Sequence, residues 1–296
     1  MVGLVKFFAW CAASAKLEHA LACGRFLGWL VGSVFRIRRK VVTEQLTRCF
    51  PERPPEEIKR IADQVYQQQG MNVIEMLRVS VLGLEDLEGR ITIENRGSSN
   101  IFDRDYGAVL ALMAHVGNWE LVGYSTKLSD REATVVVKPI KNQALNTYIK
   151  YTREKMGVHM LPHRNSFRDC LRVAKAQKGL AIVLDQNRAR DDGIFVDFFG
   201  KKACTSIGLA VISQKTKLPV HPIFCMRKPN HRDFTLLVGE TIEVPPDHAK
   251  ETMVEYTQKY THAIENIIRE YPAQWLWLHK RWKTQPLEHE QNTKDT

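Results

Sequence analysis

A histidine and a glutamate lie five positions apart in the segment AHVGNWE at 114–120, directly after an apolar run. A neutral histidine can act as a general base, and a carboxylate that accepts a hydrogen bond from its Nδ1 fixes the tautomer. We expect Gly117 to bend the chain and Asn118 to cap a helix, so that Glu120 folds back toward His115. The pattern predicts a catalytic pair. The competing interpretation is a structural histidine beside a solvated glutamate.

Four further polar residues are candidates for substrate contacts. Asp185 and Gln186 follow one apolar run, Lys138 follows another, and Arg164 precedes an expected helix. The carboxyl ends of parallel strands meet at one edge of a sheet, so these side chains and His115 are expected at the same edge. Lys138 and Arg164 suit a clamp for acceptor phosphates or an oxyanion. The alternatives are a turn and cap for Asp185 and Gln186, and a solvated surface charge for Arg164.

Short apolar runs alternate with helical patterns from about residue 91 onward, as in βαβ units. Nearly continuous apolar runs are typical of strands that are buried on both faces. The sequence therefore predicts an α/β fold with a mixed, largely parallel central sheet and helices on both faces. Residues 41–82 are expected to form a helical lid or support. The expected strands are 109–114, 134–137, 180–184 and 220–225, and the expected helices are 119–127, 144–156, 166–177, 205–216 and 250–270.

The first 35 residues are rich in Phe, Trp and Leu and carry four charges that do not share one helix face. This segment lacks the polar face of a helix that lies flat on a membrane. We interpret it as an uncleaved N-terminal membrane-anchor helix, followed by the basic flank 36–40 that keeps the rest of the chain on the cytoplasmic side. The alternative is a helix that packs on the protein's own core. The expected organisation is an anchor and flank at 1–40, a catalytic domain at 41–286 and a disordered tail at 287–296.

The composition narrows the class of protein without choosing the ligand. The 296 residues include 43 Lys and Arg against 33 Asp and Glu, a net charge of +10, which favours an anionic partner. Six scattered cysteines form no CxxC pair and predict no disulfide framework. The sequence contains no GxGxxG, GxxxxGK[ST], GxSxG or HExxH motif. Dinucleotide, P-loop, serine-hydrolase and zincin chemistry thus lack their usual sequence support.

An ordered set of blocks resembles the bacterial lipid A biosynthesis (lauroyl and myristoyl) acyltransferases, a branch of the glycerolipid acyltransferase superfamily. The resemblance covers roughly residues 1–286 and departs at Lys138, where the family usually has Arg. Such a change keeps the charge but loses a bidentate contact. The blocks are HVGNWE (115–120), Lys138-Pro139 with Asn142, Arg153 and Gly157, Arg164, LDQ (184–186), GIFVDFFG (193–200) with Thr205 and Gly208, and WLHKRWKT (277–284).

The resemblance implies a membrane-associated enzyme on the cytoplasmic face of the inner membrane. It would move a fatty acyl chain from acyl carrier protein to a hydroxyl or hydroxyacyl group of a phosphorylated lipid A precursor. No metal or cofactor is expected, because acyl transfer needs a base and oxyanion donors. Other acceptors such as a phosphatidylinositol mannoside, and coenzyme A as donor, stay open. A non-enzymatic basic protein that binds membranes or nucleic acid is the competing class; in the preferred interpretation nucleic acid is not a partner.

Two aromatic blocks allow more than one interpretation. The Phe-rich block 193–200 is expected mainly to pack, with an acyl-chain slot as the alternative. The C-terminal block places three Trp among basic residues, which suits a lipid headgroup surface or a single-stranded nucleic acid, whereas core packing is the alternative. The Trp residues are Trp275, Trp277 and Trp282, and the basic residues are His279, Lys280, Arg281 and Lys283.

Overall fold

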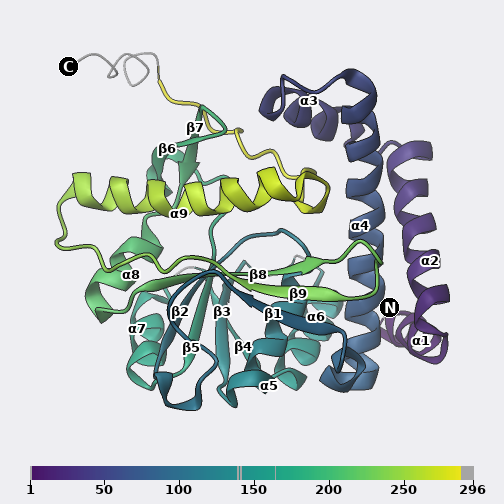
Figure 1. Ribbon diagram of the computed structural model, residues 1–296, viewed down its shortest axis with the longest axis horizontal. Coiled ribbons are helices and arrows are strands. Elements are labelled where there is room, and N and C mark those ends of the chain that lie inside the picture. The colour runs from purple at the N-terminus through teal and green to yellow at the C-terminus, as the bar shows by residue number, and fades with distance from the viewer. Residues whose placement is uncertain (1, 139, 141, 164, 288–296) are drawn as a thin grey trace.

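A largely parallel sheet forms the centre of the computed structural model, which describes residues 2–138, 140, 142–163 and 165–287 (Figure 1). Among these residues the sheet order is β1-β9-β8-β2-β5-β3-β4, with β8 and β9 antiparallel and the other neighbours parallel. The expected mixed sheet is therefore confirmed, and β2, β3, β5 and β8 are the four expected strands. The strands are β1 (Ile91–Asn95), β2 (Val109–Met113), β3 (Ala133–Val137), β4 (Val158–Pro162), β5 (Gly179–Val183), β8 (Val220–Arg227) and β9 (Phe234–Val238).

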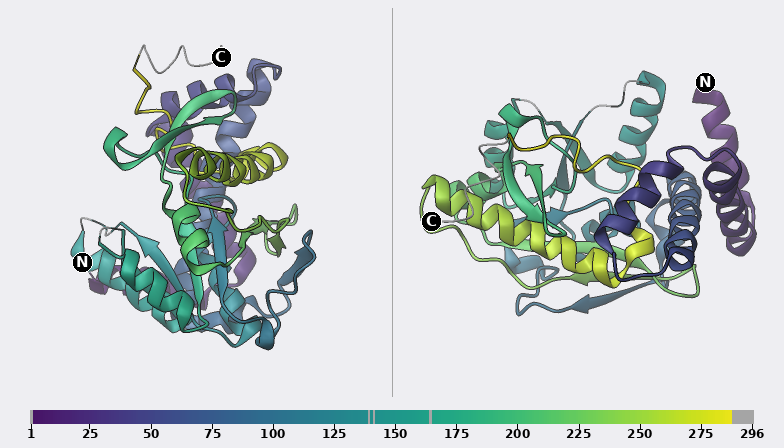
Figure 2. Two further views of the ribbon diagram at one scale, coloured as in Figure 1. Left: turned by 90° about the vertical axis from the view of Figure 1, so that its left-hand side faces the viewer. Right: turned by 90° about the horizontal axis from the view of Figure 1, so that it is seen from above.

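Helices cover both faces of the sheet, as expected (Figures 1 and 2). The long helix α4 begins at Pro55, where proline suits the first helical position, and its lower half borders the sheet. The sequence from 41 to 82 is helical, divided by a turn at residues 50–54. The helices after the N-terminal pair are α3 (Arg39–Cys49), α4 (Pro55–Leu82), α5 (Ser125–Ser129), α6 (Gln143–Lys155), α7 (Phe167–Lys175), α8 (Gly208–Thr216) and α9 (Lys250–Glu270).

The two faces of β2 belong to different cores. Leu110 and Leu112 pack with residues of α3, α7, α8 and α9. Val109, Ala111 and Met113 lie on the opposite face. There they pack with residues of the segment before α5 and of the connection between α6 and β4. All five side chains are buried because each face of the strand is covered. Because both faces of the strand are covered, the sequence of residues 109–113 does not alternate between polar and apolar side chains.

The N-terminal segment forms two helices, whereas one anchor helix was expected. They are α1 (Val2–Ser14) and α2 (Leu17–Trp29), the second continued by a π-helical turn at Leu30–Val34. Arg78 of α4 donates Nη1 hydrogen bonds to the carbonyls of Ala12 (2.6 Å) and Ala15 (2.9 Å). These carbonyls lie at the end of α1, where helical partners run out, so a buried arginine stabilises the break.

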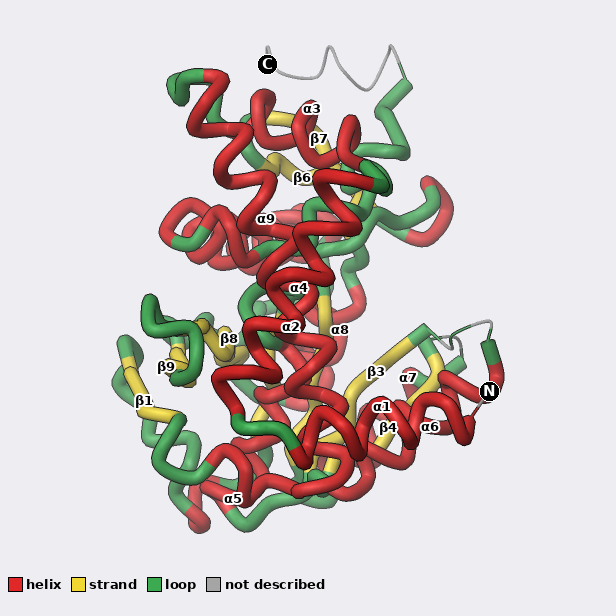
Figure 3. The backbone as a smooth tube through the Cα atoms, turned by 90° about the vertical axis from the view of Figure 1, so that its right-hand side faces the viewer, coloured by secondary structure: helices red, strands yellow, loops and turns green. Residues whose placement is uncertain are grey.

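Both helices pack beside α4, as Figures 1 and 3 show, while many of their aromatic side chains stay exposed. The exposed side chains include Phe7, Phe8, Trp10, Phe26 and Trp29. Within the described residues no single helix is long and apolar enough to cross a membrane. One bent pair, Leu17–Val34 with Arg39–Cys49 at 90°, meets the requirement by length and composition only.

Glycines bring α2 and α4 into backbone contact. A Cβ built on Gly28 would lie 2.0 Å from the carbonyl oxygen of Tyr66, and one on Gly70 would lie 2.0 Å from that of Gly24. Both distances are too short for any side chain. The spacing of Gly24, Gly28 and Gly32 places the three on one face of the helix, so the close approach extends over two turns.

The two aromatic blocks form a second core layer above the sheet. The antiparallel hairpin β6 (Ile194–Phe198) and β7 (Lys201–Thr205) lies beside α9 (Figure 1). Phe198 stacks on Trp282, and Trp275 and Trp277 are fully buried. Of the interpretations of the Trp residues, core packing is therefore confirmed, because these rings complete the core under α9 and do not face lipid. The expected tail at 287–296 lies, apart from Leu287, outside the described residues.

Candidate active site

His115 and Asp185 form a hydrogen-bonded pair at the carboxyl edge of the sheet. His115 follows β2 and Asp185 follows β5, and the two strands are parallel neighbours. The His115 Nδ1–H donates to Asp185 Oδ1 at 2.8 Å, and the His115 backbone N–H donates to Oδ2 at 3.1 Å. The indole N–H of Trp275 also donates to Oδ2, at 2.7 Å. Asp185 thus accepts three hydrogen bonds, and the Nε2 of His115 becomes the basic atom.

Pairing lowers the pKa of Asp185 and raises the pKa of His115. Burial would raise the pKa of the Asp185 carboxyl, but His115, Trp275 and the backbone N–H outweigh it and lower that pKa from 3.8 to about 2. Burial would lower the pKa of His115, yet the charge and hydrogen bond of Asp185, followed by the charge of Glu120, raise it above 6.5. The imidazolium form is therefore stabilised, as a base that receives a proton requires.

Glu120 binds Arg153 instead of His115. Arg153, on α6, donates from Nε to Oε2 at 2.9 Å and from Nη2 to Oε1 at 2.7 Å. The indole N–H of Trp119 donates to Oε1 at 3.1 Å. The expected hydrogen bond between Glu120 and the His115 Nδ1 is thus wrong, because Asp185 already occupies that nitrogen. Burial opposes the charge of Arg153, but Glu120 raises the Arg153 pKa, so the guanidinium stays charged.

The loop between His115 and Trp119 is held from two sides. Gly117 has φ +64°, and a Cβ there would lie 2.1 Å from the carbonyl oxygen of Cys225, so the expected tight bend at this glycine is confirmed. The backbone N–H of Asn118 donates to that carbonyl at 2.8 Å. Asn118 precedes the 3₁₀ helix Trp119–Tyr124, but its side chain makes no capping hydrogen bond. The expected cap is wrong because the amide turns toward Glu75.

A C-terminal segment closes the site from above. The Leu276 backbone N–H donates to the His115 carbonyl at 2.9 Å, and the Gly117 N–H donates to the carbonyl of Gln274 at the same distance. Nothing in the sequence pattern indicated this contact between segments about 160 positions apart. Trp275 and Arg153 are therefore among the site residues that spacing alone missed. Arg153 stood in one of the blocks that carry the family resemblance, which was the available signal for it.

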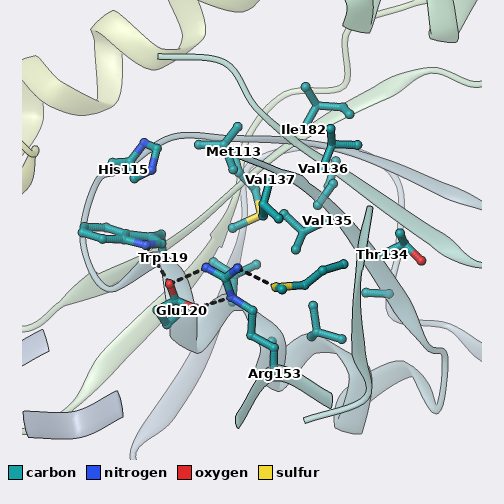
Figure 4. A pocket seen from close by; sticks show the side chains of 18 of the residues that line it. Met113, His115, Trp119, Glu120, Thr134, Val135, Val136, Val137, Arg153 and Ile182 are labelled. Carbon is teal, nitrogen blue, oxygen red and sulfur yellow. Dashed lines mark hydrogen bonds and ion pairs between the residues drawn. The ribbon is translucent and has the colours of Figure 1, made fainter. Parts of the chain in front are cut away.

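A cavity of about 840 Å³ opens at His115 and extends along the sheet. Figure 4 shows His115, Trp119 and Glu120 on one side, with Met113, Val135 and Val137 beyond them. The lining reaches Val109, Ala133 and Gly179 at the far ends of β2, β3 and β5. The cavity therefore has a polar end with ionisable groups and a long apolar part, within the size range of small-molecule sites.

The other expected site residues have different outcomes. Lys138 follows β3, is exposed and lines the cavity. Gln186 lines it too, with its Nε2 3.3 Å from the His115 Nε2. Arg164 lies outside the described residues. Of the block 193–200, no residue is among those that line this cavity, so its alternative role as an acyl-chain slot is not supported.

His279 also lines the cavity and was not a site residue in our sequence interpretation. The Asn187 backbone N–H donates to its Nε2 at 3.0 Å. Arg281, in contrast, is fully buried, donates to the carbonyl of Cys204 at 2.7 Å, and has its pKa lowered by burial to about 10. The basic C-terminal residues therefore do not form one surface.

Comparisons with known proteins agree with the resemblance. A family model described as bacterial lipid A biosynthesis acyltransferase matches residues 3–284. Similar curated proteins include the lipid A biosynthesis palmitoleoyltransferase of Escherichia coli K12 (25% identity; 92% of this chain and 88% of that protein). The lauroyltransferase of that strain is 23% identical (90% and 86%).

Two more distant similarities accompany these. A phosphatidylinositol mannoside acyltransferase of Mycobacterium tuberculosis CDC 1551 is 26% identical over 60% of this chain and 54% of that protein. The crystal structure of the 1-acyl-sn-glycerophosphate acyltransferase PlsC from Thermotoga maritima has 16% identity and a TM-score of 0.40, and covers 88% of this chain and 99% of that one. With a family model that matches almost its whole length, the chain belongs to the bacterial lipid A biosynthesis acyltransferase family.

Proposed function

We propose that this protein transfers a fatty acyl chain from a thioester, carried by acyl carrier protein, to a hydroxyl or hydroxyacyl group of a lipid A precursor. The observation that carries this function is the His115–Asp185 pair at the polar end of a deep apolar cavity. A base beside a long apolar slot suits an acyl thioester and a hydroxyl acceptor. The relatives named for lipid A acylation support the acceptor.

His115 acts as the base in direct attack. Its Nε2 removes the proton of the acceptor hydroxyl while the hydroxyl oxygen forms a bond to the thioester carbonyl carbon. Asp185 stabilises the resulting imidazolium, which has gained that proton. The carbon–sulfur bond then breaks, and the thiolate takes the proton from Nε2. No serine or cysteine nucleophile is required, so donor and acceptor are bound together.

Cationic side chains stabilise the negative charge that develops on the thioester carbonyl oxygen and bind the phosphates of the acceptor. Arg153 presents its guanidinium at the cavity wall, held there by Glu120, and is placed to stabilise the oxyanion. In this scheme Glu120 acts through Arg153 and through its charge on His115. Lys138 and Arg164 serve as contacts for acceptor phosphate, while Gln186 orients the ring of His115.

The apolar part of the cavity holds the acyl chain. Its walls come from β2, β3 and β5, and several of the lining residues on these strands are small: Ala111, Ala133, Gly179 and Ala181. Small side chains leave room above the sheet, and apolar ones favour a hydrocarbon. This replaces the Phe-rich block as the proposed slot.

The exposed aromatic side chains of α1 and α2 support membrane association at the cytoplasmic face of the inner membrane. Phe7, Trp10 and Phe26 are each more than half exposed, and exposed aromatic side chains of this size favour contact with lipid over water. The basic residues at 36–40 follow directly and suit anionic headgroups. We therefore retain the anchor, now as a helix pair, as a proposal.

The function is tested with purified protein, radiolabelled acyl-acyl carrier protein and a lipid A precursor. The wild type should transfer the chain, and His115→Ala should lose on the order of 10² to 10⁴ in rate while it keeps the wild-type thermal midpoint. Acyl-coenzyme A and a phosphatidylinositol mannoside are run in parallel to identify donor and acceptor. Folded His115→Ala with wild-type turnover would refute the mechanism; a wild type that transfers to no glycolipid would refute the function.

A further inference from the structure

His279 lines the same cavity as His115, and one of its two ring nitrogens is already occupied. The Asn187 backbone N–H donates to its Nε2 at 3.0 Å. A ring nitrogen that accepts a hydrogen bond carries no proton, so in the neutral ring the proton lies on Nδ1. The contact with Asn187 therefore makes the Nδ1–H of His279 a hydrogen-bond donor.

Asn187 is itself held in the orientation that this contact needs. Its Oδ1 accepts from the Thr284 backbone N–H, and its Nδ2 donates to the Thr284 hydroxyl, both at 3.0 Å. Asn187 lies two positions after Asp185 in the segment that follows β5. This short segment thus fixes the tautomer of two histidines, His115 through Asp185 and His279 through Asn187.

The backbone around His279 is tied to that of His115. The Leu276 N–H donates to the His115 carbonyl at 2.9 Å, and the His279 N–H donates to the Leu276 carbonyl at 3.2 Å. Gln45 of α3 donates from Nε2 to the His279 carbonyl at 3.0 Å. The two histidines therefore belong to one hydrogen-bonded framework, which fixes where the second ring lies relative to the base.

The surroundings of His279 keep its ring neutral. Burial lowers its pKa below 6.5, although the charge of Asp185 opposes this effect. The positive charges of His115, Arg281 and Arg38 lower the pKa further. Neutrality suits the site, because a second imidazolium would repel the one that His115 forms when it takes a proton. His279 can thus donate a hydrogen bond without competing for that proton.

The Nδ1–H of His279 is left for a ligand. In the part of the chain that the structure describes, Nδ1 makes no hydrogen bond. It is also not one of the buried polar atoms that lack a partner there, so Nδ1 keeps accessible surface. The ring lines the cavity together with His115 and Gln186. A substrate at this polar end therefore meets an N–H donor whose direction is set in advance.

We propose that His279 is a further substrate-binding residue of this site, whose neutral Nδ1–H donates a hydrogen bond to a negatively charged oxygen of the reacting substrates. Such an oxygen has two sources: the thioester carbonyl, which becomes negative during the attack, or a phosphate of the glycolipid acceptor. The inference rests on the proposed function, because it presupposes acyl transfer at His115. Its test must therefore separate the two sources and stay distinct from the test of the function.

Two amide variants distinguish a donor from a structural role, because each copies one ring nitrogen. The amide group of Asn lies as many bonds from Cβ as Nδ1, and that of Gln lies as many as Nε2. His279→Asn keeps a donor for the substrate and loses the acceptor for Asn187. His279→Gln keeps the acceptor for Asn187 and loses the donor. Both are compared with His279→Ala in the full chain.

His262 provides the matched control. It lies on α9, is exposed and does not line the cavity, so His262→Asn and His262→Gln make the same chemical changes away from the site. We expect both control variants to transfer the acyl chain at the wild-type rate. All variants are compared at equal amounts of folded protein, as measured by their thermal midpoints.

We expect His279→Ala and His279→Gln to lose roughly ten- to a hundredfold in kcat/KM, as loss of a hydrogen bond to a charged group does. His279→Asn should keep more activity than His279→Gln. A loss in kcat at unchanged KM assigns the hydrogen bond to the thioester oxygen, whereas a raised KM of the acceptor assigns it to the phosphate.

Activity of His279→Gln equal to or above that of His279→Asn would overturn the inference, because His279 would then act only by holding Asn187. Wild-type activity of His279→Ala would overturn it too. Either result leaves the proposed function standing as long as the wild type transfers the chain. A wild type that transfers to no glycolipid contradicts the proposed function itself, and this inference with it.

If the His279 variants do not fold, nitrogen NMR of the histidine-labelled wild type decides. At neutral pH the proton of His279 must lie on Nδ1, and the Nδ1 resonance must shift when a thioether analogue of the donor or the lipid A precursor is added. The ligand that causes the shift identifies the source of the oxygen. A proton on Nε2, or an Nδ1 resonance that neither ligand moves, would overturn the inference.

Discussion

At the residue scale, the chemistry depends on which carboxylate holds His115. Asp185 is bound to Nδ1 at 2.8 Å and is buried, whereas Glu120 is bound to Arg153. The two acids thus have separate tasks: Asp185 sets the tautomer and basicity of the imidazole, and Glu120 fixes a cation. The histidine and the glutamate of the HxxxxE motif therefore belong to two neighbouring ion pairs, His115–Asp185 and Glu120–Arg153, and do not pair with each other.

The pH dependence of activity follows from this assignment. The pKa of His115 is raised above 6.5, and the base must be neutral, so kcat/KM should rise with pH through a midpoint above 6.5. Asp185→Asn removes the main raising cause and leaves burial, which lowers the pKa of His115. The acidic limb of its residual activity should therefore move to lower pH. An acidic limb at the wild-type position would contradict the assignment.

We expect Glu120 to contribute to turnover through its negative charge. Glu120→Gln leaves the buried Arg153 without a counter-ion, at a cost of about 1.5 to 3 kcal/mol, or roughly tenfold to a hundredfold in turnover. Glu120→Asp retains the charge and should keep part of the activity. Initial rates at saturating substrates measure both, and Asp169→Asn, an exposed acid paired with Arg172, is the control. Equal rates for Glu120→Gln and wild type would show that the ion pair is dispensable.

At the element scale, the strands position the site and the sequence predicted them well. The runs 109–114 and 180–184 are long and apolar enough to predict buried parallel strands. From these strands we could predict that His115, Asp185 and Gln186 lie at the same edge of the sheet. The sequence could not predict that Glu120 binds Arg153, because this ion pair depends on the direction in which the Arg153 side chain leaves α6. Trp275 could not be predicted either, because its hydrogen bond to Asp185 spans 90 positions and leaves no local pattern in the sequence.

The face of β2 that lines the cavity should control the length of the acyl chain. Ala111 lies midway along that strand, and Ala111→Phe would fill the cavity at this depth. The variant should favour shorter chains when donors of several lengths compete, as mass spectrometry of the products would show. Leu112→Phe is the control, since Leu112 packs in the opposite core. A wild-type product distribution from folded Ala111→Phe would place the acyl chain elsewhere.

The contact between α2 and α4 should be intolerant of any side chain at its glycines. Gly28→Ala forces a methyl group against the backbone of Tyr66, and overpacking of this kind costs about 1 to 3 kcal/mol. The thermal midpoint should fall, and proteolysis at residues 14–16 should become faster. Gly3→Ala meets nothing within 4 Å and should behave as wild type. Equal proteolysis rates for the two variants would mean that the contact is not maintained.

At the scale of the whole molecule, five of the exposed aromatic side chains, Phe7, Phe8, Trp10, Phe26 and Trp29, belong to the helix pair α1 and α2. This pair lies beside α4 (Figures 1 and 3). Trp10→Glu combined with Phe26→Glu should weaken binding to phospholipid vesicles. Burial of a large apolar side chain is worth about 1.5 to 3 kcal/mol, so a loss of roughly tenfold or more per residue is expected. Ile93→Glu on β1 removes an exposed apolar group that does not belong to the pair and should bind as wild type. Unchanged vesicle binding of the double variant would exclude the helix pair as the membrane contact.

The glycine contact between α2 and α4 has one more consequence. Most packing inside proteins depends on the exclusion of water, and such packing loses its driving force once lipid replaces water around it. Backbones that touch through glycines are held by close van der Waals fit, which works equally in both solvents. Under the proposed membrane association, this fit would therefore hold the helix pair against α4 in hydrocarbon as well as in water. Because Gln69, Val73 and Met76 of α4 line the cavity, the site would then keep a fixed position relative to the lipid that the helix pair contacts.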